Sequence, residues 1–242
     1  MSDKKLWSIL VAAGAGSRMQ AEIPKQYLIV NGMTILECSL IFLSQIPCEK
    51  IIVVINKNDV FFENIFEKNP DIAWHKIVTV IGGDQRSDSV YNGLQYVEQC
   101  SDITHDIVLI HDAARPCADI DLTQQLYHMV QSEQSCSGGI LAIPVTDTIK
   151  RVDEKKQIRS VSRDQLWRAQ TPQIFKINVL IKAFEYIRKE GIPITDESMA
   201  VEQLGSEDLV ILESSVDNLK VTYKSDLYMV RRILNQRYSL EK

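Results

Sequence analysis

Short apolar runs alternate with longer helical segments, and this alternation restricts the fold more than any other feature of the sequence. Four such runs, at 7–13, 51–55, 77–81 and 107–110, are apolar at nearly every position. A strand of a parallel sheet that is covered by helices on both faces has this composition, because neither face meets water. The alternation therefore predicts a doubly wound α/β fold with a mostly parallel sheet.

Helix signals occupy the intervals between the apolar runs. Thr34 and Glu37 have the spacing of a capping box, which predicts a helix start. Helices are expected at about 34–44, 87–97, 119–132, 177–189 and 225–238, and further strands at 139–143 and 209–212.

The alternation stops after residue 140, and a polar segment at about 147–163 follows. Its apolar residues flank a charged tip at 153–156, which favours a two-stranded arm over a plain surface loop. Such a β-arm is marginally stable alone, so a second subunit is a reasonable partner for it. Residues 1–242 are otherwise predicted to form a single domain, because α/β folds of about 250 residues are common.

Composition excludes several classes of protein. The 27 Lys and Arg residues against 32 Asp and Glu give a net charge of −5, which argues against coating nucleic acid but allows a local positive pocket. Five cysteines without a CxxC pair favour a reducing cytoplasm over disulfides or a zinc site. The apolar run 6–13 is too short to span a membrane. We expect a cytoplasmic protein with neither nucleic-acid nor membrane partners.

The first motif, Ala12-Ala13-Gly14-Ala15-Gly16-Ser17-Arg18-Met19, follows the first predicted strand, and Lys25 lies shortly after it. Small residues let backbone N–H groups approach phosphate oxygens, and two cations are present, so the loop predicts a triphosphate cradle. An NAD-binding fingerprint fits less well, because Met19 stands at its third glycine position and no acid ends the second strand. The Gly-Lys-Ser/Thr of a Walker A loop is also missing.

A second motif, from Gly82 and Gly83 to Ser89, follows the third predicted strand. A helix starts there, and its first N–H groups are donors for an anion. An ordinary glycine turn with a helix cap is the alternative interpretation.

A third motif, His111-Asp112-Ala113-Ala114-Arg115-Pro116, ends the fourth predicted strand. A carboxylate at this place can hold Mg²⁺ together with phosphates and water, so Asp112 is the predicted metal ligand. His111 is expected to be structural, because magnesium prefers oxygen ligands, and Arg115 is expected to clamp the loop.

Taken together, the motifs resemble one family. The patterns A-A-G-x-G-x-R-M, P-K-Q, G-G-x-x-R-x-x-S-V, H-D-A-A-R-P, T-P-Q, T-D-E and D-N-x-K-V-T occur in this order between about residues 8 and 224. The ordered set resembles the 2-C-methyl-D-erythritol 4-phosphate cytidylyltransferases of non-mevalonate isoprenoid biosynthesis. The resemblance implies a Rossmann-like nucleotidyltransferase fold and transfer of CMP from CTP to that sugar phosphate, with release of pyrophosphate.

The resemblance also implies roles for individual residues. Cytosine and ribose would be held, mostly by backbone, at Ala12, Ala13, Gly14, Gly83, Asp84 and Ser89. Arg18 and Lys25 would contact the triphosphate, and Asp112 would ligate Mg²⁺. The acceptor would be positioned by Thr148, Arg163, Thr171, Thr195 and Lys220, with Arg163 and Lys220 adding positive charge.

The family is a homodimer, so the resemblance implies that the arm embraces a partner. Thr148 and Arg163 would then serve the partner's pocket. The chain is too short for a fused cyclodiphosphate synthase, and one activity is expected.

Two other functions remain open at this point. A ribitol 5-phosphate cytidylyltransferase would share the fold and differ in the acceptor pocket. The second alternative is a non-catalytic nucleotide-binding module. Against it, Arg18, Lys25 and Asp112 together form a charged set that binding a nucleotide does not by itself require.

Overall fold

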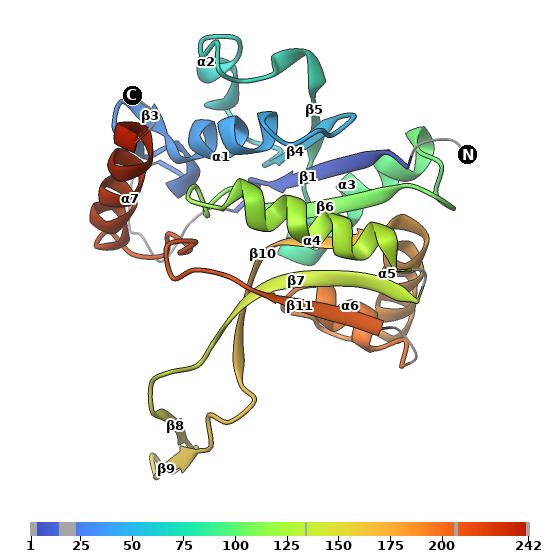
Figure 1. The fold of residues 1–242 in the computed structure, drawn as a ribbon, viewed down its shortest axis with the longest axis vertical. Helices are drawn as coiled ribbons and strands as arrows, with labels where there is room; N and C mark the ends of the chain where they lie inside the picture. The colour runs from blue at the N-terminus through green and yellow to red at the C-terminus, as the bar shows by residue number, and fades with distance from the viewer. Residues whose placement is uncertain (1–3, 15–22, 134, 206–207, 241–242) are drawn as a thin grey trace.

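A seven-stranded sheet forms the centre of the computed structural model, which describes residues 4–14, 23–133, 135–205 and 208–240 (Figure 1). The strand order is β11-β7-β10-β6-β1-β4-β5. All neighbouring strands run parallel except β10, which runs antiparallel to both β6 and β7. The strands are β1 (Leu6–Val11), β4 (Ile51–Ile55), β5 (Ile77–Ile81), β6 (Ile107–Asp112), β7 (Cys136–Pro144), β10 (Trp167–Lys176) and β11 (Asp208–Glu213).

Helices cover both faces of this sheet. Along β1, Leu6 and Leu10 pack into one core with residues of α1 and α4. Trp7 and Ile9 pack into the opposite core with residues of α3, α5 and α6. The predicted doubly wound, mostly parallel fold is therefore confirmed. The helices are α1 (Ile35–Ser44), α2 (Phe62–Ile65), α3 (Arg86–Cys100), α4 (Ile120–Ser132), α5 (Ile177–Glu190), α6 (Glu197–Glu202) and α7 (Asp226–Leu240).

The start of α1 follows its predicted cap. Thr34 Oγ1 accepts the Glu37 N–H at 3.1 Å, and the Glu37 carboxylate accepts the Thr34 N–H at 2.8 Å. The predicted capping box is thus present. Near it lies a short antiparallel pair, β2 (Ile29–Val30) and β3 (Met33–Thr34), and α7 packs its Val230 and Leu234 into the same small core.

Strand β10 is the largest departure from the predicted elements, because no strand was expected at Trp167–Lys176. It is inserted between β6 and β7, with a register shift between Ala169 and Gln173. Pro172 lies at that irregularity, where a ladder does not need its missing N–H. A proline argues against a central strand, so Pro172 made a strand at this place hard to predict from the sequence.

The parallel strands bring three of the predicted loops to one edge of the sheet. Because β1, β4, β5 and β6 run in the same direction, their carboxyl ends meet there, and the three motifs follow β1, β5 and β6. Ligands of open α/β sheets bind at this edge. Within the part of the chain that the structure describes, no helix is long and apolar enough to cross a membrane.

A separate hairpin projects from the body. Strands β8 (Ile149–Val152) and β9 (Ile158–Val161) pair only with each other, and Figure 1 shows them away from the seven-stranded sheet. Most of the hairpin's residues are exposed. Its part in a dimer remains a prediction.

Candidate active site

A cavity of about 310 Å³ opens at the carboxyl edge of the sheet. It brings together residues from loops that are far apart in sequence, as the strand-end rule predicts. The predicted site residues that line it are Ala12, Ala13, Gly14, Lys25, Gly83, Asp84, Ser89, Asp112 and Lys220.

The other predicted residues lie elsewhere. Thr148 and Arg163 are exposed near the base of the β8–β9 hairpin, where the Arg163 guanidinium donates to the Thr146 carbonyl. Thr195 is exposed just before α6. None of these three is among the described residues that line the cavity. Arg18 lies outside the described residues.

Two carboxamide side chains hold the loop after β1. Gln26 Nε2 donates to the Ala12 carbonyl at 2.6 Å, and Asn56 Nδ2 donates to the Ala13 carbonyl at 3.3 Å. Gly82 approaches this loop so closely that a Cβ at residue 82 would lie 2.6 Å from the Ala13 Cβ. Any side chain there would push into the floor of the cavity, which explains the glycine.

Ser89 holds the loop before α3. Its Oγ accepts the Gly83 N–H at 3.2 Å and donates to the Gln85 carbonyl at 3.1 Å. Ser89 is buried in the first turn of the helix. In this structure Gly83 and Ser89 therefore bind each other, and Asp84 and Gln85, just before α3, also border the cavity. Their direct contacts with CTP remain a prediction.

A buried carboxylate lies between two cations at the centre of the site. Asp112 Oδ2 lies 2.6 Å from Lys220 Nζ, and its Oδ1 lies 2.9 Å from Arg86 Nε. Burial alone would raise the pKa of Asp112, but the charges of Arg86 and Lys220 outweigh it and lower the pKa. Asp112 is therefore ionised at neutral pH. Beside this pair, Lys25 Nζ donates to the Val221 carbonyl at 3.0 Å.

Arg86 extends the ion pair to a second carboxylate. Its Nη1 and Nη2 lie 2.6 and 3.0 Å from the two carboxylate oxygens of Glu197. Glu197 is completely buried at the start of α6. Burial raises the pKa of Glu197, and the charge of Arg86 opposes this shift. Basic and acidic side chains thus alternate in the order Lys220, Asp112, Arg86 and Glu197. No role was predicted for Arg86 or Glu197, although both stand inside quoted motifs next to a helix start.

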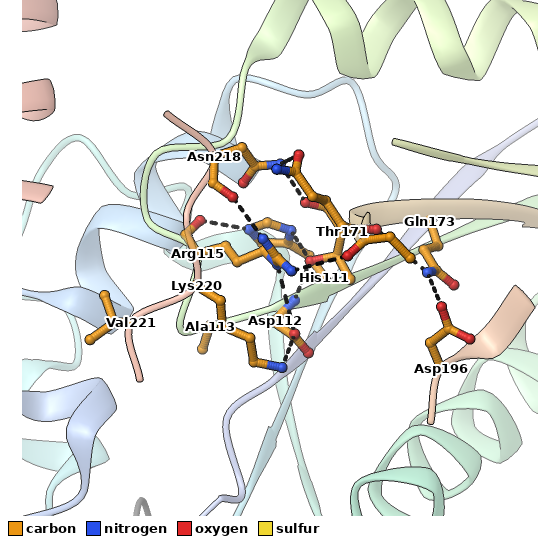
Figure 2. A network of polar contacts seen from close by, with 12 residues as sticks. His111, Asp112, Ala113, Arg115, Thr171, Gln173, Asp196, Asn218, Lys220 and Val221 are labelled. Atoms are coloured by element: carbon orange, nitrogen blue, oxygen red, sulfur yellow. Dashed lines mark hydrogen bonds and ion pairs between the residues drawn. The ribbon is translucent and has the colours of Figure 1, made fainter. Parts of the chain in front are cut away.

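Figure 2 shows a polar network behind Asp112. His111 Nε2 lies 3.0 Å from the Arg115 carbonyl, and its Nδ1 lies 3.0 Å from Thr171 Oγ1. Thr171 Oγ1 also accepts the Asp112 N–H at 3.1 Å. Burial lowers the pKa of His111 to about 4, so the ring is neutral at pH 7. This geometry agrees with the structural role expected for His111.

Arg115 has the clamping role that the motif predicted. Its Nη1 donates to the Asn218 carbonyl at 2.7 Å, and its Nη2 donates to the Ala169 carbonyl at 3.4 Å. Asn218 Nδ2 in turn donates to the Thr171 carbonyl at 2.9 Å. The loop after β6 is thereby tied to β10 and to the segment before α7.

The oxygen ligands at the site can be set against the usual coordination of Mg²⁺. Among the described residues, no three His, Cys, Asp or Glu side chains gather in a way that could hold a metal ion. Asp112 alone fits the usual magnesium pattern of one or two carboxylates completed by phosphates and water. Each of its oxygens accepts one hydrogen bond from a cation and retains a further lone pair, and Arg115 Nε lies 4.0 Å from Oδ2 as a third cation. The residues fit a metal that is shared with a substrate phosphate.

Several known proteins resemble this chain over nearly its whole length. A family model described as 2-C-methyl-D-erythritol 4-phosphate cytidylyltransferase matches residues 6–236. A protein of that name from Acinetobacter baumannii (strain ACICU) is 42% identical over 235 residues, covering 96% of this chain and 95% of the relative. One from Hahella chejuensis (strain KCTC 2396) is 39% identical and covers 98% of this chain and 97% of the relative.

A solved structure is also similar. The crystal structure of the Francisella tularensis protein of the same name has a TM-score of 0.79 to this chain at 36% sequence identity. The likeness covers 95% of this chain and 100% of that one. The similarity in structure therefore extends over nearly the whole chain.

Proposed function

The chain belongs to the 2-C-methyl-D-erythritol 4-phosphate cytidylyltransferase family, and on that basis we propose that it joins CTP and 2-C-methyl-D-erythritol 4-phosphate. The products are 4-CDP-2-C-methyl-D-erythritol and pyrophosphate, and the reaction belongs to non-mevalonate isoprenoid biosynthesis. Ribitol 5-phosphate is not favoured as the acceptor, because the family model and the relatives carry the methylerythritol name.

One observation carries the proposal: Lys25, Arg86 and Lys220 border a single cavity around the ionised Asp112. This cavity lies at the edge of the sheet where the loops after β1 and β5 could hold a nucleotide. A module that only bound a nucleotide would not need three cations in one place.

The chemistry needs no general base. An oxygen of the acceptor phosphate attacks the α-phosphorus of CTP, and the bond between that phosphorus and the oxygen bridging to the β-phosphorus breaks to release pyrophosphate. A phosphate monoester has a second pKa near 6, so the attacking oxygen is already anionic at pH 7. The neutral, buried His111 is accordingly not required as a base.

Repulsion between the two phosphates is the main obstacle. Two unit charges 4 Å apart repel by roughly 4 kcal/mol at an effective dielectric constant near 20, and several charges meet here. Lys25, Lys220 and Arg86 offset this repulsion, and Arg18 is proposed to assist from the loop after β1. Because their partners already hold these side chains in place, positioning and electrostatic stabilisation carry most of the catalysis.

Mg²⁺ is part of the proposal, with Asp112 as its protein ligand. When bound, the ion would neutralise charge on the triphosphate oxygens. Asp112 also orients Lys220 and Arg86, so this carboxylate would join the metal to the two cations.

The β8–β9 hairpin is proposed to contact a second copy of the chain. The apolar side chains of Val152 and Ile158 are 58% and 67% exposed, which leaves apolar surface for a partner to cover. Thr148 and Arg163 lie near the base of the same hairpin. In a homodimer they would be placed to serve the partner's acceptor pocket.

A cytoplasmic location is the last part of the proposal. The five cysteines are free thiols, and four of them are buried. Free cysteines are usual in a reducing compartment, where disulfides rarely persist.

Release of pyrophosphate tests the proposed function. CTP is incubated with 2-C-methyl-D-erythritol 4-phosphate, with ribitol 5-phosphate or with no acceptor, and UTP and GTP replace CTP in parallel reactions. Pyrophosphate that depends on both CTP and the methylerythritol phosphate is expected. Pyrophosphate release from CTP with ribitol 5-phosphate but not with the methylerythritol phosphate would rule out the proposed acceptor. No pyrophosphate release with either acceptor would rule out the transferase activity.

A further inference from the structure

Four hydrogen bonds behind Asp112 form a closed ring, visible in Figure 2. They join Thr171 Oγ1 to His111 Nδ1, His111 Nε2 to the Arg115 carbonyl, Arg115 Nη1 to the Asn218 carbonyl, and Asn218 Nδ2 to the Thr171 carbonyl. The ring ties together three segments that are far apart in sequence: the end of β6, the middle of β10 and the segment before α7.

The partners fix the direction of each bond. The Arg115 carbonyl can only accept, so His111 Nε2 carries a proton. In the neutral imidazole, Nδ1 is then an acceptor, and the Thr171 hydroxyl donates its one proton to Nδ1. The same hydroxyl oxygen accepts the Asp112 N–H. The Thr171 hydroxyl therefore has no proton left to give to a substrate.

Burial makes the ring rigid. Thr171 and Asn218 are 4% and 1% exposed, and His111 is completely buried with its ring against Phe42, at 5.1 Å between centroids. A hydrogen bond lost at such a site leaves a polar group without a partner, which is costly. The ring is thus expected to keep one geometry.

The ring holds both ends of the central ion pair. Asp112 is bound to it through its own N–H, and Lys220 follows the ring member Asn218 by two residues. The backbone N–H of Val221, next in the chain, donates to the Ala114 carbonyl at 2.8 Å. A shift in the ring would therefore move Asp112 and Lys220 relative to each other.

We propose that Thr171, His111 and Asn218 are positioning residues that set the Asp112–Lys220 pair for catalysis, an inference that rests on the proposed function. Thr171 acts through its hydroxyl on His111 and on the Asp112 backbone, and not through a contact with the acceptor. This differs from the acceptor-binding role that the family resemblance implies for Thr171. The two roles make opposite kinetic predictions.

Two substitutions at residue 171 separate these roles. Thr171→Val keeps the shape and removes the hydroxyl, and it is expected to lower kcat at least about 10-fold, because small displacements of reacting groups are costly. KM for both substrates should stay within about threefold, since the substrate contacts are retained. Thr171→Ser restores the hydroxyl and should recover most of kcat.

Thr123→Val in α4 is the matched control. Thr123 is also completely buried, and its hydroxyl donates to the Asp119 carbonyl away from the cavity. The control should retain kcat even where it loses thermal stability. A kcat loss in Thr171→Val alone would then report positioning and not the general cost of a buried hydroxyl.

A spectroscopic measurement is independent of any substrate. In the ¹⁵N NMR spectrum of the full chain, His111 should show a protonated Nε2 and an unprotonated Nδ1. Thr171→Val should shift the Nδ1 signal together with the ¹³C signal of the Asp112 carboxylate. This experiment tests the hydrogen-bond ring even if the pyrophosphate assay rules out the proposed acceptor or the proposed transferase activity.

Three results would overturn the positioning role. The first is a proton on Nδ1 in the unsubstituted protein. The second is a folded Thr171→Val variant with normal kcat, including one in which only KM for the acceptor rises. The third is a Thr171→Ser variant as impaired as Thr171→Val.

Discussion

The cavity at the sheet edge and the β8–β9 hairpin are both rich in charged residues, but only the cavity organises its charges within one chain. Around Asp112, cations lie at hydrogen-bonding distance and the carboxylate is buried. On the hairpin, most side chains are exposed, and Lys150 Nζ donates to the Ser160 hydroxyl at 2.7 Å. The ion pairs of the cavity form within one chain, whereas the hairpin carries exposed apolar side chains such as Val152 and Ile158.

This difference separates two kinds of catalytic contribution. Cavity residues should affect turnover directly, because their partners already fix them. Hairpin residues should act only when a second subunit is present. Substitutions in the two regions are therefore expected to differ in size, in the kinetic constant affected and in their dependence on protein concentration.

Lys25→Ala should give the largest effect. Loss of one preorganised cation is expected to lower kcat at least about 100-fold. Lys25→Arg is the control, because it keeps the charge. Steady-state pyrophosphate release from a variant shown to be folded by circular dichroism measures the effect. Near-normal turnover in Lys25→Ala would remove this residue from the mechanism.

Asp112→Asn should destabilise the protein by about 3 kcal/mol at neutral pH, as breaking a buried ion pair does. The pKa of Asp112 is lowered in the folded state, so its stabilising contribution is fully present above the unfolded pKa near 4. It decreases progressively as the pH falls from that value towards the lowered pKa of the folded state. Urea unfolding from neutral pH to about pH 3 should show the two proteins converging.

The same Asp112→Asn variant tests the proposed metal ligand. Turnover of the unsubstituted protein should rise with Mg²⁺ concentration, and the variant should lose this response. A variant that follows the same Mg²⁺ titration as the unsubstituted protein would place the metal elsewhere. A stability difference that persists unchanged at low pH would contradict the ion pair.

Arg163→Ala should give a smaller and more selective effect. KM for the sugar phosphate is expected to rise by about 10-fold, the cost of losing one charge-assisted contact, with KM for CTP nearly unchanged. Initial rates measured over a grid of both substrates separate the two constants. Equal increases in the KM values for the sugar phosphate and for CTP would show that Arg163 does not act in the acceptor pocket.

Ile158→Asp should give the smallest kinetic effect at high protein concentration. A charge on the exposed apolar side of the hairpin is expected to weaken the proposed dimer, so sedimentation velocity should show more monomer on dilution. Val60→Asp is the control, because Val60 is 70% exposed on the body of the molecule. A dimer equally stable in both variants would rule out Ile158 as an interface residue.

Much of the cavity could be predicted because its residues stand at strand ends. The apolar runs located β1, β5 and β6, and parallel strands bring their carboxyl ends to one edge. Lys25 and Asp112 were therefore expected to be neighbours before the fold was known. The resemblance then added Lys220 from a distant segment.

The remaining parts of the site depend on contacts that no local pattern contains. Arg86 and Glu197 are 111 residues apart, and their pairing follows only from how α3 and α6 pack on the same face of the sheet. Strand β10 mixes polar and apolar residues and has Pro172 near its centre. Because its place between β6 and β7 was not predicted, the ring through Thr171 could not be predicted either.

A crystal structure with a non-hydrolysable CTP analogue and 2-C-methyl-D-erythritol 4-phosphate tests the central claim most directly. The account predicts that the α-phosphorus lies beside Lys25 and Lys220, with an acceptor phosphate oxygen within attacking distance of it and Asp112 next to both phosphates. A triphosphate bound elsewhere, such as in the groove between α3 and α5 beside Arg188, would contradict it.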